Sequence, residues 1–289
     1  MTPSTHEGCA DPLARFDAVL RARATADVDD ADLVAAAHHH LAGGRRRRAR
    51  LAIALGARFA LEARTVDAVA ACVELLHAAS LVHDDLQDRA LTRRGRASVV
   101  HRFGEDTALL LGDVLIAAAL GAAGELRGDG TRPTPTARAA RAVARTASGQ
   151  NRDRGRHDAF DFASYAAVAQ AKAAPLFALP FELVLVEGGR VDAVPRAQHA
   201  ATHFALAYQL RDDLADVASD ERGGEPNAVL LLEAGGRSRG GAMATVADEA
   251  RAHLAEARTA AAGLPSGAAG PLVTLCTALG EELEVAWTR

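Results

Sequence analysis

The chain has 289 residues, 49% of them hydrophobic and 24% charged, and this balance excludes an intrinsically disordered protein. The formal net charge of −4 argues against a nucleic-acid-binding protein, which usually carries a basic excess. The longest apolar run, residues 114–124, lies between Asp113 and Glu125 and is about half the ~20 residues that a membrane-spanning helix needs. We therefore predict a protein that has no membrane span and binds no nucleic acid.

The cellular compartment is predicted from the N-terminus and the cysteines. The first residues include Glu7, Asp11 and Asp17 and lack the apolar core of a signal peptide. The three cysteines stand far apart and form no CxxC pair, which fits a reducing compartment better than a disulfide framework or a zinc site. We predict a cytoplasmic protein.

The alanine-rich, aromatic-poor composition favours helices, and only 4% of the residues are aromatic. Residues 1–10 are predicted to be a loose tail, and helical patterns follow from Pro12 onward. Glycine and proline clusters predict breaks at residues 43–44, 93–95, 127–136, 149–158, 188–189, 223–226, 235–241 and 263–270. No stretch alternates long enough to predict a strand. We predict an all-α single domain over residues 1–289 with about ten or more helices.

Three aspartates end the apolar segment LHAASLVHDDLQD (residues 76–88): Asp84, Asp85 and Asp88, the first acidic motif. Residues four apart lie on one face of a helix, so Asp84 and Asp88 project together. Like charges at this spacing destabilise a helix modestly. A bound cation that neutralises them would explain the pattern.

The same spacing recurs in YQLRDDLAD (residues 208–216), where Asp212, Asp213 and Asp216 form the second acidic motif. One such motif is a weak signal, because acidic residues on a helix usually form a solvated face. Two copies, each after an apolar helix, favour a function. If the two helices face each other, the carboxylates surround a cavity suited to Mg²⁺, which bridges to substrate phosphates. The pattern therefore indicates a diphosphate ligand.

Basic residues accompany the two motifs. Arg45 to Arg48 follow the pair Gly43-Gly44, Arg93 and Arg94 follow the first motif, and Lys172, the only lysine in the sequence, lies between the motifs. An arginine fork binds phosphate bidentately, and a lysine acts as a point charge. By itself the arginine run would indicate a solvated helix start or a nucleic-acid patch. The three histidines at residues 38–40 are predicted to be solvated, and Tyr208 is predicted to serve helix packing.

Together these segments resemble the trans-isoprenyl diphosphate synthase (polyprenyl synthetase) family, in the family's order and over nearly the whole chain. The family's segments GGKRxRP, H-x6-DDxxD, RRG, LLGD, GQxxD, KT and FQxxDDxxD correspond to residues 43–49, 77–88, 93–95, 110–113, 149–153, 172–173 and 208–216. The resemblance implies an isoprenoid-synthase bundle around a central prenyl-diphosphate cavity, and a homodimer. Arg45, Ala49 and Ala173 replace the family's lysine, proline and threonine. The segment after Asp216 is shorter than usual and has no lysine.

The resemblance implies head-to-tail condensation of an allylic diphosphate with isopentenyl diphosphate, with three Mg²⁺ ions per site that Mn²⁺ can replace. Asp84, Asp88 and Asp212 would hold metal, supported by Asp85, Asp213 and Asp216. The implied catalytic residues are Asp84, Asp85, Asp88, Arg93, Lys172, Gln209, Asp212 and Asp213. The implied substrate-binding residues are Arg45, Arg48, His77, Arg93, Arg94, Lys172 and Gln209. No protein base is needed, because the released diphosphate can take the proton.

Product length depends on the side chains one turn or more before the first acidic motif. In the family, bulky aromatics there stop the chain at farnesyl, whereas here Ala79 and Ser80 are small and Leu76 or Cys72 would be the next barrier. We therefore predict a product of geranylgeranyl length or longer.

Two alternatives stay open. A terpene cyclase (lyase) uses the same metal clusters but typically has an NSE-type second motif, unlike Asp212, Asp213 and Asp216. A non-catalytic partner subunit of a synthase would be expected to have eroded acidic motifs, and both are intact here.

Overall fold

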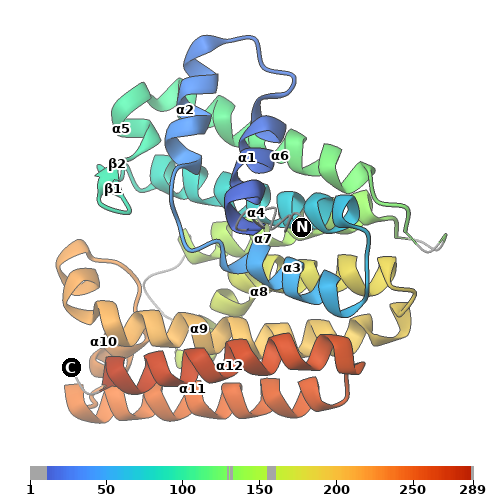
Figure 1. Ribbon diagram of the computed structural model, residues 1–289. Coiled ribbons are helices and arrows are strands. Elements are labelled where there is room, and N and C mark those ends of the chain that lie inside the picture. Colours follow the sequence, from blue (N-terminus) through green and yellow to red (C-terminus); the bar gives the residue numbers. More distant parts are fainter. Residues whose placement is uncertain (1–11, 129, 131–132, 155–160, 288–289) are drawn as a thin grey trace, which may run out of the picture. The chain divides into compact units, whose positions relative to one another are not determined.

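A computed structural model describes residues 12–128, 130, 133–154 and 161–287 of the chain (Figure 1). Within these ranges lie twelve α-helices, one short 3-10 helix and a two-stranded hairpin, which confirms the all-α class and the number of helices. The predicted loose tail, residues 1–10, lies outside the described residues. The chain divides into two compact units, each described by itself: Met1–Ile53 with Ala63–Leu126, and Ala54–Glu62 with Arg127–Arg289. The single domain over residues 1–289 stays a prediction.

The first unit is built around one buried helix, α4. Its elements are α1 (Pro12–Thr25), α2 (Ala31–Leu41), the start of α3 (Arg47–Arg58), α4 (Ala63–Gln87), β1 (Thr92–Arg93), β2 (Arg96–Ala97), α5 (Val99–Phe103) and α6 (Glu105–Gly124). Helix α4 packs along α6. At Gly112 of α6, a Cβ would lie 1.9 Å from Nε2 of His83 on α4. The glycine of the LLGD segment therefore allows α6 to approach the helix that carries the first acidic motif.

A tight hairpin follows the first acidic motif. Thr92–Arg93 pairs antiparallel with Arg96–Ala97, and the two residues between have positive φ, 54° for Arg94 and 71° for Gly95. A two-residue type I′ turn requires positive φ at both central positions, which explains the glycine. The predicted break at 93–95 is therefore this turn. Sequence alternation did not reveal the strands because each has only two residues.

The second unit consists of the end of α3 and the helices of the C-terminal half. These are α7 (Pro135–Arg154), α8 (Phe162–Glu187), η1 (Val191–Ala193), α9 (Val194–Gly223), α10 (Ala228–Ala234), α11 (Arg239–Ala262) and α12 (Ser266–Trp287). Helix α8 packs between α7 and α9, and α9 also packs along α11 and α12 (Figure 1). Helix α9 carries the second acidic motif and contacts most of the other helices of its unit.

The predicted break at 149–158 is wrong at its start, because α7 continues through Gly149 to Arg154. A Cβ on Gly149 would lie 2.4 Å from the backbone nitrogen of Lys172 on α8. This glycine therefore serves close packing of two helices and does not end one. Similarly, α12 begins at Ser266 inside the break predicted at 263–270.

Within the part of the chain that the structure describes, three helices are long and apolar enough to cross a membrane by length and composition alone: α4, α6 and α8. The buried share of their most apolar windows is 72%, 39% and 56%, respectively. Unbroken apolar runs do not reveal such helices, because a spanning helix tolerates an occasional charge. The absence of a membrane span therefore stays a prediction.

Candidate functional site

The first acidic motif completes the last turn of α4. The backbone N–H of Asp88 donates to the carbonyl oxygen of Asp84 at 2.9 Å, so the helical spacing of the motif is kept. Asp85 is fully buried, Asp84 is half-buried and Asp88 is exposed. The outer carboxylates can therefore reach a ligand from solvent, and the middle one is part of the interior.

The buried Asp85 is held by Arg93 from the hairpin. Nε of Arg93 donates to Oδ1 of Asp85 at 2.9 Å, and Nη2 donates to the same oxygen. The other oxygen, Oδ2, is buried and accepts no hydrogen bond from any described residue. A buried carboxylate oxygen without a donor is costly, and a hard cation or an ordered water would satisfy it. The residues of the first acidic motif therefore fit a magnesium ion.

Four basic side chains gather in the first unit beside this motif: His40, Arg48, His77 and Arg94. Burial lowers the pKa of His77 well below its usual value, and the charges of Arg48 and Arg94 lower it further. The imidazole of His77 is thus neutral at physiological pH. Three of the predicted substrate-binding residues, Arg48, His77 and Arg94, are therefore close enough to interact, whereas Arg45 is exposed.

The guanidinium of Arg94 lies against Gly44, the second glycine of the pair before the arginine run. A Cβ on Gly44 would lie 2.6 Å from Nη1 of Arg94, and φ of Gly44 is +97°. Burial and the nearby charge of Arg46 lower the pKa of Arg94. Gly44 therefore makes room for a predicted substrate-binding arginine.

Arg46 corrects the interpretation of the arginine run as a solvated patch. Its side chain is buried, Nε donates to Oδ1 of Asp17 at 2.9 Å, and Nη1 lies 3.6 Å from Oε1 of Glu74. Glu74 also accepts from the backbone N–H of Ala49 at 3.2 Å. No role was predicted for Asp17 or Glu74, because acidic residues so far from the run in sequence give no local signal.

Two of the three histidines predicted to be solvated are not. His40 is buried with Nε2 2.9 Å from the carbonyl oxygen of Ala78, and burial lowers its pKa to about 4. His39 is half-buried with Nε2 2.8 Å from the carbonyl oxygen of Ala97. Only His38 is exposed as expected. Helix α2 thus contributes His40 to the group of basic side chains in the first unit.

The predicted chain-length residues line α4 before the first acidic motif. Leu76 and Ala79 are buried, each 2% exposed, and Ser80 is half-buried. The hydroxyl of Ser80 donates to the carbonyl oxygen of His77 at 2.9 Å, so the side chain bonds back to its own helix. Ser80 is four residues before Asp84 and shares its face.

The second acidic motif lies in the C-terminal half of α9 and repeats the burial of the first. Asp213 is buried, Asp212 is half-buried and Asp216 is exposed. The carboxylate of Asp213 accepts from the hydroxyl of Tyr165 at 2.5 Å, from Nε2 of Gln209 at 2.9 Å and from the backbone N–H of Ala228 at 3.1 Å. Burial raises the pKa of Asp213 to about 6, against the effect of these donors.

Gln209 and Tyr165 therefore donate hydrogen bonds to the carboxylate of Asp213. Gln209 was predicted to bind substrate, and here its amide is used on Asp213. Tyr165, on α8, was missed because it is 48 residues from Asp213 and belongs to no motif. Tyr208, by contrast, packs as predicted, with its ring centroid 5.4 Å from that of Phe177.

Arg211 lies next to the second motif and was not predicted. Nη1 is 2.7 Å from Oδ1 of Asp212, and Nη2 is 3.0 Å from Oε2 of Glu282 on α12. The guanidinium carbon also stands 4.7 Å from the ring centroid of Tyr208. An outer carboxylate of the second motif is therefore already paired with a cation.

The segment after Asp216 is mostly helix, not the short loop that the sequence indicated. Helix α9 continues to Gly223, and Gly224 ends it in the left-handed conformation. Asn227 then caps α10, and its Nδ2 donates to the backbone oxygen of Asp213 and to Oδ2 of Asp220, both at 2.8 Å. The shortened connection is thus tied to the second acidic motif.

Lys172 is half-buried on α8, and its backbone lies at the close contact with Gly149 of α7.

The structure distributes the predicted site residues over the two units. The first unit contains Arg45, Arg48, Leu76, His77, Ala79, Ser80, Asp84, Asp85, Asp88, Arg93 and Arg94. The second contains Lys172, Gln209, Asp212, Asp213 and Asp216.

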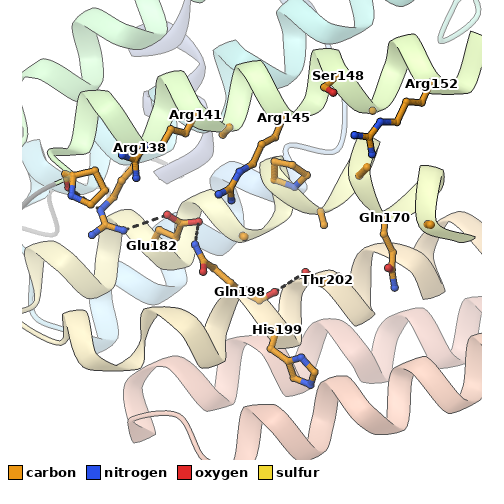
Figure 2. A pocket seen from close by; sticks show the side chains of 18 residues that line it. Arg138, Arg141, Arg145, Ser148, Arg152, Gln170, Glu182, Gln198, His199 and Thr202 are labelled. Atoms are coloured by element: carbon orange, nitrogen blue, oxygen red, sulfur yellow. Dashed lines mark hydrogen bonds and ion pairs between the residues drawn. The ribbon is translucent and has the colours of Figure 1, made fainter.

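A cavity of about 540 Å³ opens in the second unit between α7, α8 and α9 (Figure 2). Figure 2 shows Arg138, Arg141, Arg145 and Arg152 along α7 on one side of it. The side chain of Glu182 also lines the cavity. Its Oε2 is 3.4 Å from Nη1 of Arg138, and its Oε1 accepts a hydrogen bond from Nε2 of Gln198. None of the predicted catalytic or substrate-binding residues lines this cavity.

The sequence profile of the polyprenyl synthetase family matches residues 30–226 of the chain. A probable farnesyl diphosphate synthase of Bradyrhizobium diazoefficiens is 35% identical over 186 residues, which are 60% of this chain and 55% of that protein. The nonaprenyl diphosphate synthase of Mycobacterium tuberculosis is 32% identical over 170 residues, 57% of this chain and 49% of that protein. The chain thus spans about half the length of the curated relatives it matches.

Two solved structures share the fold. A geranylgeranyl pyrophosphate synthetase from the archaeon Geoglobus acetivorans has a TM-score of 0.81 at 22% identity, over 94% of this chain and 100% of that one. A polyprenyl synthase from Caulobacter crescentus, complexed with calcium and isoprenyl diphosphate, has a TM-score of 0.80 at 26% identity, over 96% of this chain and 94% of that one.

Proposed function

Because the chain belongs to the polyprenyl synthetase family, we propose that it is a Mg²⁺-dependent trans-prenyltransferase that joins an allylic diphosphate head-to-tail to isopentenyl diphosphate. The observation that carries the proposal is that the aspartates of the two acidic motifs have the same order of burial. In each motif the middle aspartate is buried and hydrogen-bonded within its own unit. The first aspartate is half-buried and the last is exposed. A merely solvated acidic face would bury none of them.

The metal ligands of this proposal are Asp84 and Asp88 in the first unit and Asp212 in the second. Their hard oxygen donors suit Mg²⁺, and the buried Oδ2 of Asp85 supports a cation at the first motif. Bound Mg²⁺ would neutralise the charge that develops on the departing diphosphate as the allylic C–O bond ionises. The complex of the Caulobacter crescentus polyprenyl synthase with calcium and isoprenyl diphosphate supports a divalent cation in this role.

The basic side chains of the first unit fit the diphosphate of the second substrate. Arg48 and Arg94 supply charge, and the neutral imidazole of His77 supplies a hydrogen bond without adding repulsion. Nε and Nη2 of Arg93 donate to Asp85, and Nη1 of the same guanidinium would donate to a phosphate oxygen. Lys172 of the second unit adds a point charge for the allylic diphosphate. These residues orient the two substrates, and the released diphosphate takes the proton.

The experiment is an incubation of the pure protein with Mg²⁺, isopentenyl diphosphate and, in turn, dimethylallyl, geranyl and farnesyl diphosphate. Products are identified by mass spectrometry before and after phosphatase treatment, with Asp84→Ala as the control. Metal-dependent growth in five-carbon steps supports the proposal. A hydrocarbon or alcohol formed without isopentenyl diphosphate identifies a cyclase instead. No turnover by a folded protein favours a non-catalytic subunit of a synthase.

Product length is proposed to be geranylgeranyl or longer, because the face of α4 before Asp84 carries small side chains. The half-buried Ser80 can accept a larger side chain more readily than the buried Ala79. We expect Ser80→Phe and Ala79→Phe to shorten the main product by at least one five-carbon unit, with Ser80→Ala as the matched control. Unchanged products from folded variants would exclude this face as the floor.

A homodimer is also proposed from the family resemblance. Leu109 and Leu110 of α6 are 50% and 51% exposed, which supports an apolar surface on this helix. Location in the cytoplasm is proposed because the three cysteines of the sequence form no CxxC pair, which fits a reducing compartment. Sedimentation of the purified chain tests the dimer.

A further inference from the structure

Three histidines and a glutamate meet on the second unit where α9 packs along α11. His199 and His203 are four residues apart on α9, and His253 and Glu256 are three residues apart on α11. Both spacings place the two side chains on one face of a helix. None of these residues belongs to the acidic motifs or to the family's sequence segments.

The side chains of this His–Glu cluster already touch one another. Nε2 of His199 is 3.1 Å from Oε1 of Glu256, and Nδ1 of His203 is 2.7 Å from Nδ1 of His253. The ring centroids of His199 and His203 are 4.6 Å apart. One possible ligand atom from each of His199, His203 and Glu256 lies within 4.8 Å of the other two. Figure 2 shows His199 pointing away from the arginines of α7 and towards the C-terminal helices.

This geometry is unfavourable for positively charged imidazoles and suitable for neutral ones. Burial and the neighbouring histidines lower the pKa of His203, and burial lowers that of His253. The carboxylates of Glu249 and Glu256 lie close enough to act on His253 in the opposite direction. Neutral imidazole nitrogens beside a carboxylate are the donors that zinc, nickel and copper prefer, whereas Mg²⁺ prefers oxygen.

We propose that His199, His203 and Glu256 form a site for a transition-metal ion of the zinc type, with His253 as a further ligand. Zinc–nitrogen bonds of about 2.0–2.1 Å in a tetrahedron place neighbouring ligand atoms about 3.3 Å apart. The exposed His199 and Glu256 reach this spacing by side-chain rotation, and His203 and His253 separate by a fraction of an ångström.

The bound ion would cross-link α9 to α11. Helix α9 also carries the second acidic motif, which begins nine residues after His203. Since the metal binds the folded arrangement and not the separated helices, it stabilises the second unit, and the stabilisation grows with the logarithm of the metal concentration over the dissociation constant. The site is therefore structural, and it accepts a different class of metal from the aspartates.

The test is a zinc titration of the full chain without a polyhistidine tag, in competition with a chromophoric chelator. Millimolar Mg²⁺ is present throughout so that the acidic motifs do not compete. We expect one Zn²⁺ per chain, a higher melting temperature with Zn²⁺, and a loss of affinity of about 10-fold or more in His199→Ala with His203→Ala. The Co²⁺ form should show the visible absorption of nitrogen ligation, and this should disappear in the same variant.

Two control variants separate binding at the His–Glu cluster from binding at other histidines and from unfolding. His101→Ala changes an exposed histidine of the first unit and should keep full zinc affinity. Glu256→Gln keeps the shape of the side chain, removes its charge and should weaken binding without unfolding, as circular dichroism would show. Zinc affinity unchanged in the histidine variants, or lost in Asp212→Ala instead, would overturn the proposal.

Discussion

The two acidic motifs have the same sequence pattern and the same order of burial, but their middle carboxylates are held differently. Asp85 is bound by the guanidinium of Arg93, eight residues further along the chain. Asp213 is bound by neutral donors, the hydroxyl of Tyr165, the amide of Gln209 and the backbone N–H of Ala228. Among the described residues, the first carboxylate is therefore compensated by charge and the second by dipoles.

Because of this difference, the two units should lose different amounts of stability when one partner of the middle aspartate is removed. An ion pair with a buried partner depends on both members, because removal of one leaves an uncompensated buried charge. A carboxylate held by several neutral donors loses less when one is removed, and it can also take up a proton. The raised pKa of Asp213, about 6, is the direct consequence of burial without a cation.

The largest expected effect is the loss of turnover when an outer carboxylate is removed. Asp84→Ala and Asp212→Ala should each reduce kcat by about 10²- to 10³-fold, because each removes a proposed ligand of the metal that would neutralise the departing diphosphate. Steady-state kinetics with isopentenyl diphosphate measure this, and Asp27→Asn, an exposed aspartate outside both motifs, is the control. If only one of the two variants loses activity, the motifs are not equivalent and one of them is structural.

The next effect is on stability and distinguishes the two ways of holding the middle carboxylate. Arg93→Ala should lower the free energy of unfolding by about 3–5 kcal/mol, because it leaves the buried Asp85 unpaired. Tyr165→Phe should lower it by about 1–3 kcal/mol, because Gln209 and Ala228 still donate to Asp213. Urea denaturation compares them. Equal losses would show that the charge on Arg93 is unimportant for stability.

The dependence of stability on pH should have opposite signs in the two units. Burial lowers the pKa of His40 from 6.5 to about 4, so its contribution is present above pH 6.5 and is lost as the pH falls towards 4. Burial raises the pKa of Asp213 from 3.8 to about 6, so the protonated folded form is favoured at low pH and this contribution is lost as the pH rises through 6.

Unfolding free energies measured across this pH range in the presence of a chelator test both signs. Relative to the parent chain, His40→Gln should remove the loss on the acid side, and Asp213→Asn should remove the decline between about pH 4 and 6. A parent and variant with parallel profiles would show that the substituted group does not titrate there.

A further effect on stability, no larger than that of Tyr165→Phe, comes from the two glycines at helix contacts. Gly149→Ala should destabilise the chain by about 1–3 kcal/mol, because its Cβ meets the backbone of Lys172, which cannot rotate away. Gly112→Ala meets only the ring of His83, which can move, and should cost less. Gly121→Ala, where a Cβ has open space, is the control in thermal melts. A larger loss at Gly112 would reverse this comparison.

The sequence by itself determined the helical class and the faces of the two acidic motifs. Both follow from local rules: alanine favours helix, and residues four apart share a face. The glycine pair before the arginine run and the turn at Arg94-Gly95 were likewise visible, because a positive φ leaves a local signature in the residue type.

Only the tertiary structure decided which of these polar residues are buried and what holds them. The donor to Asp213 is Tyr165, 48 residues away, and the acceptor for His40 is the carbonyl oxygen of Ala78, 38 residues away. Such pairs depend on how distant helices pack, and a single sequence contains no signal for that. For the same reason the arginine run did not reveal that Arg46 is an interior residue, and the His–Glu cluster of α9 and α11 was invisible until the two helices lay side by side.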